Sequence, residues 1–154
     1  MSTTAPARPP ITCHVLDTTT GRPASSLSIT LTCTSVPDIE FTGTTNHDGR
    51  ITAWSNTLGP KGDKGSYVRE KAVEKGGVSE ALRAMIDEQG ADSGDASRPA
   101  GSSLWKLRFD TGAHYGIENT FFPVVELSFL VNKEEHFHVP LLLGPHSFTT
   151  YRGS

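Results

Sequence analysis

The stretch Ile11-Thr12-Cys13-His14-Val15-Leu16 decides the fold, because apolar side chains at 11, 13 and 15 alternate with the side chains at 12, 14 and 16. A period of two places successive side chains on opposite faces of a strand. Similar short runs, most of them alternating, recur at 26–33, 40–45, 50–54, 105–110, 125–131, 136–141 and 148–151. About eight short strands separated by turn residues predict an all-β sandwich.

The segment 57–103 interrupts this pattern with many of the chain's glycines and charged residues. Within it, residues 79–90 predict a short helix, with Ser79 as the N-cap and Gly90 at the C-terminal end. Leu82, Met85 and Ile86 fall on one face of that helix. The flanks 59–65 and 90–103 have linker composition. We interpret 57–103 as an insertion between two strands, most simply a solvated excursion, with a regulatory or lid role as the alternative.

Length and composition define one domain and exclude two classes of partner. The 154 residues suffice for a single core, and we expect residues 1–10 to form a disordered lead-in to one domain at 11–154. The formal net charge of −3 provides no field that would attract nucleic acid. No apolar run approaches the roughly 20 residues that cross a bilayer, so no membrane partner is expected.

The cysteine content and the termini indicate where the protein works. Cys13 and Cys33 are too few for a disulfide framework, and no N-glycosylation sequon is present. The first ten residues lack the apolar region of a secretory signal. The terminal Arg152-Gly153-Ser154 is not a Ser-Lys-Leu peroxisomal signal. We therefore expect a cytoplasmic protein, with a peroxisomal location left open.

Three histidines are predicted on the outside of the sandwich. If the apolar positions fill the core, His14, His136 and His138 point away from it. An outer sheet face becomes a cleft only when something covers it, and a second copy of the chain is the most economical cover. The sequence therefore predicts an active site at a subunit interface.

The chemistry of these residues suits hydrolysis. A pair of histidines can hold a water molecule and take its proton near neutral pH. Arg50 and Arg152 can hold substrate oxygens or stabilise charge that develops on them. A zinc-dependent hydrolase is an alternative, with His136, His138 and His14 as ligands around an open position. Cys13 falls on the apolar face, which disfavours it as a nucleophile.

The C-terminal tail Tyr151-Arg152-Gly153-Ser154 follows the apolar run 139–143 after one short polar segment. Chain ends usually fray unless packing holds them. A tail that ends in aromatic, guanidinium and hydroxyl groups is predicted to be docked, with its side chains and α-carboxylate in a site.

Several segments together resemble the 5-hydroxyisourate hydrolases, the transthyretin-like proteins of purine catabolism. The resemblance spans most of 11–154 outside the insertion and rests on Cys13–Asp17, Gly21–Ala24, Thr45–Arg50, Arg108–Gly112, Phe121–Pro123, His136–Leu143 and Tyr151–Ser154. The terminal tetrapeptide is similar to the one that separates these hydrolases from transthyretin, the hormone carrier with the same fold.

The resemblance implies a transthyretin-like sandwich of two four-stranded sheets with one short helix. It also implies a homotetramer with active sites in the channel between dimers. The implied reaction opens the ring of 5-hydroxyisourate to 2-oxo-4-hydroxy-4-carboxy-5-ureidoimidazoline without a cofactor or metal. The family's catalytic residues fall on His14, Arg50 and His138. Its substrate-contacting tail falls on Tyr151 and Ser154, with Arg152 nearby.

Three features depart from the family's usual pattern. The insertion is longer than the connection in bacterial members, and the segment 112–120 is a shortened counterpart of the family's helix. His146 adds an imidazole in an unusual turn, and like His136 it has no assigned role.

A non-catalytic carrier of small ligands with the same fold is the main rival to a hydrolase, since fold does not dictate function. A carrier channel favours apolar and hydroxyl side chains where this chain has His14, Arg50 and His138. A structural or adhesion sandwich would be expected to have a secretory signal or a disulfide.

Overall fold

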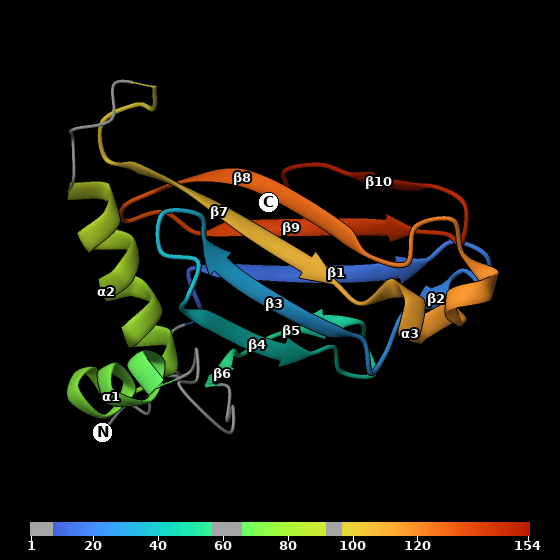
Figure 1. The fold of residues 1–154 in the computed structure, drawn as a ribbon, viewed down its shortest axis with the longest axis horizontal. Coiled ribbons are helices and arrows are strands. Elements are labelled where there is room, and N and C mark those ends of the chain that lie inside the picture. The colour runs from blue at the N-terminus through green and yellow to red at the C-terminus, as the bar shows by residue number, and fades with distance from the viewer. Residues whose placement is uncertain (1–7, 57–65, 92–96) are drawn as a thin grey trace.

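The computed structural model describes residues 8–56, 66–91 and 97–154, whose strands form two sheets packed face to face (Figure 1). The first sheet has the order β10-β9-β1-β2, with β5 also paired to β1. Its strands are β1 (Ile11–Asp17), β2 (Arg22–Pro23), β5 (Arg50–Ile51), β9 (Phe137–Leu143) and β10 (Phe148–Thr150). The second sheet has the order β6-β4-β3-β7-β8. Its strands are β3 (Ser28–Cys33), β4 (Glu40–Thr44), β6 (Ser55–Asn56), β7 (Ser102–Phe109) and β8 (Val125–Asn132).

The predicted all-β sandwich is confirmed, but each sheet has five strands instead of the four expected. The two additional strands, β2 and β6, are only two residues long. The strand predicted at 50–54 is only Arg50–Ile51, because the chain then crosses to the other sheet and pairs with β4 as β6. The buried Trp54 fills this crossing and donates its indole Nε1–H to the Ile11 carbonyl oxygen at 2.8 Å.

The period-two pattern in β1 and β9 places the core where the sequence predicts it. Ile11, Cys13 and Val15 are fully buried, whereas Thr12 and His14 between them are partly exposed. From the opposite sheet, Trp105, Leu107 and Phe109 pack into the same core. Burial of such side chains is worth about 1.5–3 kcal/mol each, so the register of β1 is strongly specified.

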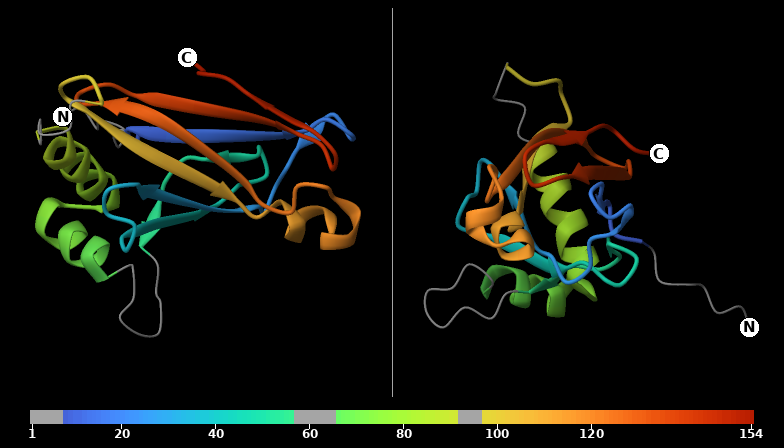
Figure 2. Two further views of the ribbon diagram at one scale, coloured as in Figure 1. Left: turned by 45° about the horizontal axis from the view of Figure 1, so that its top comes forward. Right: turned by 90° about the vertical axis from the view of Figure 1, so that its right-hand side faces the viewer.

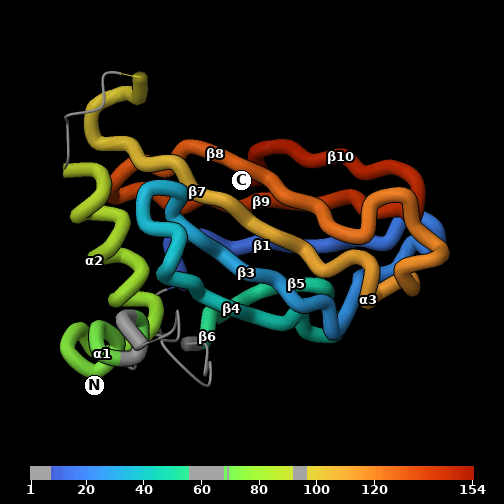
Figure 3. The backbone as a smooth tube through the Cα atoms, viewed as in Figure 1, coloured from blue at the N-terminus to red at the C-terminus, as the bar shows by residue number. Residues whose placement is uncertain are grey.

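The helices lie at the two ends of the sandwich (Figures 1 and 3). At one end are α1 (Ser66–Lys75) and α2 (Val78–Ala91), and at the other are α3 (Thr111–Tyr115) and a 3₁₀ turn (Ile117–Asn119). The short helix expected at 112–120 is therefore present. Among the described residues, no helix is both long and apolar enough to cross a membrane.

The insertion differs from its prediction in three respects. The helix predicted at 79–90 starts one residue earlier and ends one later, so Ser79 lies in its first turn and does not cap it. Leu82, Met85 and Ile86 join the main core, so α2 is part of the packed domain and the predicted solvated excursion is wrong for it. Helix α1 was not predicted, because its apolar residues do not gather on one face. The flank at 59–65 lies outside the described residues.

The lead-in is ordered from residue 8, which corrects the prediction of disorder as far as residue 10; residues 1–7 lie outside the described part. Pro9 and Pro10 are buried. The Pro10 carbonyl accepts the Phe137 N–H at 2.8 Å, which fastens the lead-in beside β9.

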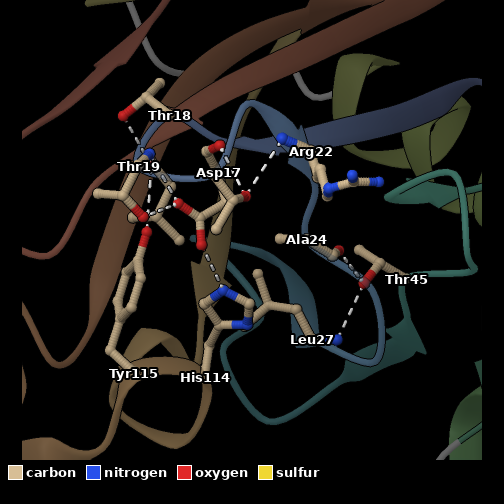
Figure 4. A network of polar contacts seen from close by, with 11 residues as sticks. Asp17, Thr18, Thr19, Arg22, Ala24, Leu27, Thr45, His114 and Tyr115 are labelled. Carbon is tan, nitrogen blue, oxygen red and sulfur yellow. Dashed lines mark hydrogen bonds and ion pairs between the residues drawn. The ribbon is translucent and has the colours of Figure 1, made fainter.

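A buried polar cluster ties the end of β1 to α3 (Figure 4). The Asp17 carboxylate accepts hydrogen bonds from the Thr19 backbone N–H at 2.9 Å and from its hydroxyl at 2.6 Å. It also lies 3.0 Å from Nε2 of His114. Although burial opposes ionisation, the hydrogen bonds of Thr19, His114 and Tyr115 lower the pKa of Asp17 to about 2.

Candidate active site

Three strands bring the predicted catalytic residues onto the outward face of the first sheet. The parallel register of β1 and β9 pairs Thr12 with His138 and His14 with Pro140. The antiparallel pairing of β1 and β5 places Arg50 opposite His14. The His14 and His138 rings are roughly parallel, with centroids 6.4 Å apart and planes inclined by 28°. His14, Arg50 and His138 therefore lie together outside the core, as predicted.

A tight turn sets the position of Arg50. The side-chain oxygen of Asn46 accepts the backbone N–H groups of Asp48 and Arg50 at 2.9 and 3.0 Å. Gly49 has a φ of +74°, and a Cβ there would lie 2.4 Å from the Val15 carbonyl oxygen. Only glycine meets both requirements without displacing the strand.

The C-terminal tail is docked, which confirms the prediction. Beyond β10 the chain continues alongside β9 (Figure 2), and the Gly153 N–H donates to the His138 carbonyl oxygen at 2.8 Å. A Cβ at Gly153 would lie 2.7 Å from Cδ2 of the His138 ring and 3.0 Å from Cγ of Pro140. The tail thus runs in contact with the His138 imidazole.

Two adjoining hollows open at this face and share Arg50, His138 and Ser154. One, of about 330 Å³, is also lined by His14, Pro140, Tyr151 and Gly153. The other, of about 230 Å³, adds the polar side chains of Arg8, Thr12 and His136. Together they present imidazoles, guanidinium groups and Ser154 to a small polar ligand.

The surroundings favour the neutral form of the His14 and His138 imidazoles. Burial lowers the pKa of His14, and the Arg50 cation lowers it further. The pKa of His138 is lowered by burial first, then by Arg50 and by the neighbouring His14. Neutral imidazoles have a free lone pair and can accept a proton. By contrast, burial raises the pKa of the Cys13 thiol to about 12, which leaves it inert.

The tail residues divide between two locations. Ser154 lines both hollows, and the half-exposed Tyr151 lines the larger one. Arg152 lines neither of them. Its guanidinium is 3.3 Å from a carboxylate oxygen of Glu135 and lies over the Phe137 ring, 4.8 Å from the centroid. Tyr151 and Ser154 therefore share a hollow with His14 and Arg50, whereas Arg152 lines a third hollow, of about 460 Å³, together with His138 and Tyr151.

Sequence reasoning missed two contributors and left a third unassigned. Thr12 and Arg8 were not singled out, and His136 had no role. Thr12 Oγ1 lies 2.9 Å from Nδ1 of His138 and 3.3 Å from Nε2 of His136. Thr12 is two residues before His14 on the same strand, so strand periodicity already predicted that the two side chains share the outward face. His146 is exposed in the turn between β9 and β10 and lines neither hollow.

The histidines do not form the zinc site considered above. Within the described ranges, no group of three or more His, Cys, Asp or Glu side chains could hold a metal ion. The Thr12 hydroxyl contacts both His136 and His138, and it engages the ring nitrogens that face it.

Comparisons with known proteins agree with this fold and site. The model of the HIUase/Transthyretin family matches residues 11–153. The chain is 31% identical to the probable 5-hydroxyisourate hydrolase of Schizosaccharomyces pombe over 157 residues, which cover 97% of this chain and 94% of that protein.

Two solved structures share the fold. Klebsiella pneumoniae 5-hydroxyisourate hydrolase aligns with a TM-score of 0.56 at 21% identity, covering 96% of this chain and 100% of that chain. Sea bream transthyretin, solved in complex with thyroxine, aligns with a TM-score of 0.57 at 20% identity, covering 94% of each chain. Since an enzyme and a thyroxine-bound protein match equally well, the fold alone does not choose between hydrolase and carrier.

Proposed function

This chain belongs to the HIUase/Transthyretin family, and from that membership we propose that it hydrolyses 5-hydroxyisourate to 2-oxo-4-hydroxy-4-carboxy-5-ureidoimidazoline in urate degradation. The observation that supports this most is the convergence of His14, Arg50 and His138 on one outward face. A relative 31% identical over nearly its whole length is named as a probable 5-hydroxyisourate hydrolase.

In the proposed mechanism, His14 and His138 orient a water molecule and one imidazole accepts its proton. The water oxygen bonds to a ring carbonyl carbon, and Arg50 stabilises the oxyanion of the tetrahedral intermediate. The carbon–nitrogen bond of that carbonyl then breaks, and the imidazolium returns the proton to the leaving nitrogen. General acid–base catalysis of this kind is worth about 10²–10⁴ in rate.

Substrate contacts are assigned to Tyr151 and Ser154, which line the hollows with the histidines. Ser154 contributes its hydroxyl. A substrate contact for Arg152 is also proposed. In this protomer its guanidinium pairs with Glu135.

The active face is proposed to be closed by neighbouring protomers in a homotetramer. Arg50 is exposed, and Tyr151 retains 57% of its accessible surface. Side chains that bind a substrate gain from exclusion of water, since electrostatic stabilisation is stronger in a drier site. A second copy of the chain covering the outward face would supply that exclusion.

The test is to generate fresh 5-hydroxyisourate from urate and follow its ultraviolet decay with wild-type protein, with the His14→Asn variant and without protein. Acceleration by the wild type that is lost in the variant supports the proposal. Decay at the protein-free rate with folded wild type would remove it.

The two alternatives have distinct outcomes in the same assay. A zinc hydrolase would lose activity on treatment with a chelator, whereas the proposed mechanism retains it. A non-catalytic carrier would leave the decay unchanged. An apolar ligand is not favoured in the two hollows that contain Arg50, because they present His14, Arg50 and His138 where such a ligand needs apolar walls.

A further inference from the structure

We propose that Thr12 and His136 are positioning residues that hold His138 in the tautomer with its proton on Nδ1 and a free lone pair on Nε2. The proposal deepens the hydrolase function above, and it rests on that function for its catalytic meaning. The geometry itself is independent of any substrate.

The direction of the hydrogen-bond chain is fixed at its far end by Pro9. Nδ1 of His136 lies 2.9 Å from the Pro9 carbonyl oxygen. A carbonyl oxygen can only accept, so Nδ1 of His136 must carry a proton. Pro9 is buried and lies next to Pro10, whose carbonyl is bonded to β9. The acceptor is thus held by the fold.

In the middle of this series of hydrogen bonds, one arrangement of protons satisfies every contact. Neutral His136 with a proton on Nδ1 has only a lone pair on Nε2, so it accepts the Thr12 hydroxyl proton across 3.3 Å. Thr12 has no second proton, and its oxygen must accept at its other contact. That contact is Nδ1 of His138 at 2.9 Å, which therefore donates. Neutral His138 is left with its lone pair on Nε2.

A protonated, positively charged His136 would reverse the direction of the hydrogen bonds between Thr12 and the two histidines. A protonated His136 donates from both nitrogens, so the Thr12 hydroxyl would turn toward His138 and donate to its Nδ1. His138 would then carry its proton on Nε2 and could not act as a base there. This series of hydrogen bonds from Pro9 through His136 and Thr12 to His138, called the relay below, consequently requires a neutral His136.

The surroundings of His136 favour the neutral form. Burial lowers its pKa, and the cations Arg8 of the lead-in and Arg83 of α2 lower it further, while the Pro9 carbonyl acts in the opposite direction. Arg8 also lines the smaller hollow with His136. The insertion helix α2 therefore contributes a charge to the electrostatics of the relay.

The backbone holds both partners of the central bond. Thr12 and His138 are directly paired in the parallel register of β1 and β9, so their side chains emerge side by side on the same face. On its other side, His138 is confined by Gly153, at which a Cβ would lie 2.7 Å from the ring. The imidazole is held between the Thr12 hydroxyl and the tail.

The test measures the tautomer of His138 directly. In protein labelled with ¹⁵N-histidine, the nitrogen shifts of His138 are recorded at pH 7.5 for wild type, Thr12→Val and Thr12→Ser. Valine has nearly the shape of threonine but no hydroxyl, and serine keeps the hydroxyl. We expect Nδ1–H in wild type and Thr12→Ser, and a shift of population toward Nε2–H in Thr12→Val.

Kinetics on 5-hydroxyisourate complete the test. Thr12→Val should lower kcat by about tenfold, a fraction of the 10²–10⁴ of general base catalysis, with KM little changed, and Thr12→Ser should restore most of it. Wild-type His138 protonated on Nε2, or a Thr12→Val variant with unchanged tautomer and kcat, would overturn the proposal. If the predicted tautomers are observed but wild type does not hydrolyse 5-hydroxyisourate, the relay stands and the proposed function fails.

Discussion

At the scale of single residues, the proposed chemistry depends on imidazoles that stay neutral beside a cation. His14 and His138 have lowered pKa values because of burial first and of Arg50 second. A base with a lowered pKa loses activity only as the pH falls through that pKa. We therefore expect kcat/KM to have an acid limb with its midpoint below the ordinary histidine value of about 6.5.

The Arg50→Gln variant separates the effect of the Arg50 cation on the histidine pKa values from the effect of burial. Removing the cation should move the acid limb to higher pH, while kcat falls because oxyanion stabilisation is lost. The measurement is the pH profile of kcat/KM for both proteins. A limb that stays in place or moves to lower pH would show that Arg50 does not act on the histidines.

Gly153 provides a steric test of the same site. An alanine Cβ would lie 2.7 Å from the His138 ring, so either the tail or the imidazole must move. We expect Gly153→Ala to lower kcat/KM by about tenfold or more, since small displacements of catalytic groups are costly. Thr149→Ala, in the adjoining exposed part of β10, is the matched control and should retain wild-type kinetics. Wild-type kinetics in Gly153→Ala would mean that tail and ring do not need this contact.

Parity along the strands predicts that His14 and His138 face outward, and the family resemblance assigns catalytic roles to them and to Arg50. Thr12 escaped notice, since a threonine on a strand is ordinary and gains meaning only from the parallel pairing with His138. That pairing joins residues 126 positions apart. Periodicity within one strand cannot show it.

At the scale of elements, the Asp17 cluster should anchor β1 to α3. With a folded pKa of about 2 against an ordinary value of 3.8, ionised Asp17 stabilises the folded state by about 2 kcal/mol above pH 4. This contribution is lost as the pH falls from about 4 to 2. Asp17→Asn should therefore reduce the free energy of unfolding by about 2 kcal/mol at pH 7, with a much smaller difference from wild type near pH 2. Urea titrations at both pH values check this, and an equal difference at both would contradict it.

Helix α2 should behave as a core element. Leu82 is fully buried in the main cluster, so Leu82→Ala should destabilise the domain by about 2–5 kcal/mol. Asp87→Ala on the exposed side of the same helix is the control. Thermal unfolding of the two variants distinguishes a packed helix from a detached excursion, for which both would match wild type.

Element boundaries were predictable where apolar periodicity was strong, as in β1, β9 and α2. They were not predictable where pairing alone creates the element. Strand β5 exists through two pairs with β1, and β6 through two pairs with β4. Among the side chains of α1 that the structure describes, Val68 alone joins the core cluster, and the sequence of this helix gives little periodic signal.

At the scale of the whole molecule, the outward position of the candidate site is the reason for proposing an assembly. The proposed homotetramer predicts a mass in solution of four times the 16.6 kDa chain. Analytical ultracentrifugation measures this directly. A monomer with full hydrolase activity would show that the outward face of the first sheet works without a neighbouring protomer over it.

The central claim is that the outward imidazoles perform the hydrolysis. Its most direct test is the decay rate of fresh 5-hydroxyisourate with wild type, His138→Asn and the matched His146→Asn, whose histidine is exposed and outside both hollows. We predict a fall in kcat of about 10² or more for His138→Asn and wild-type turnover for His146→Asn. Near-full turnover by a folded His138→Asn variant would contradict the account.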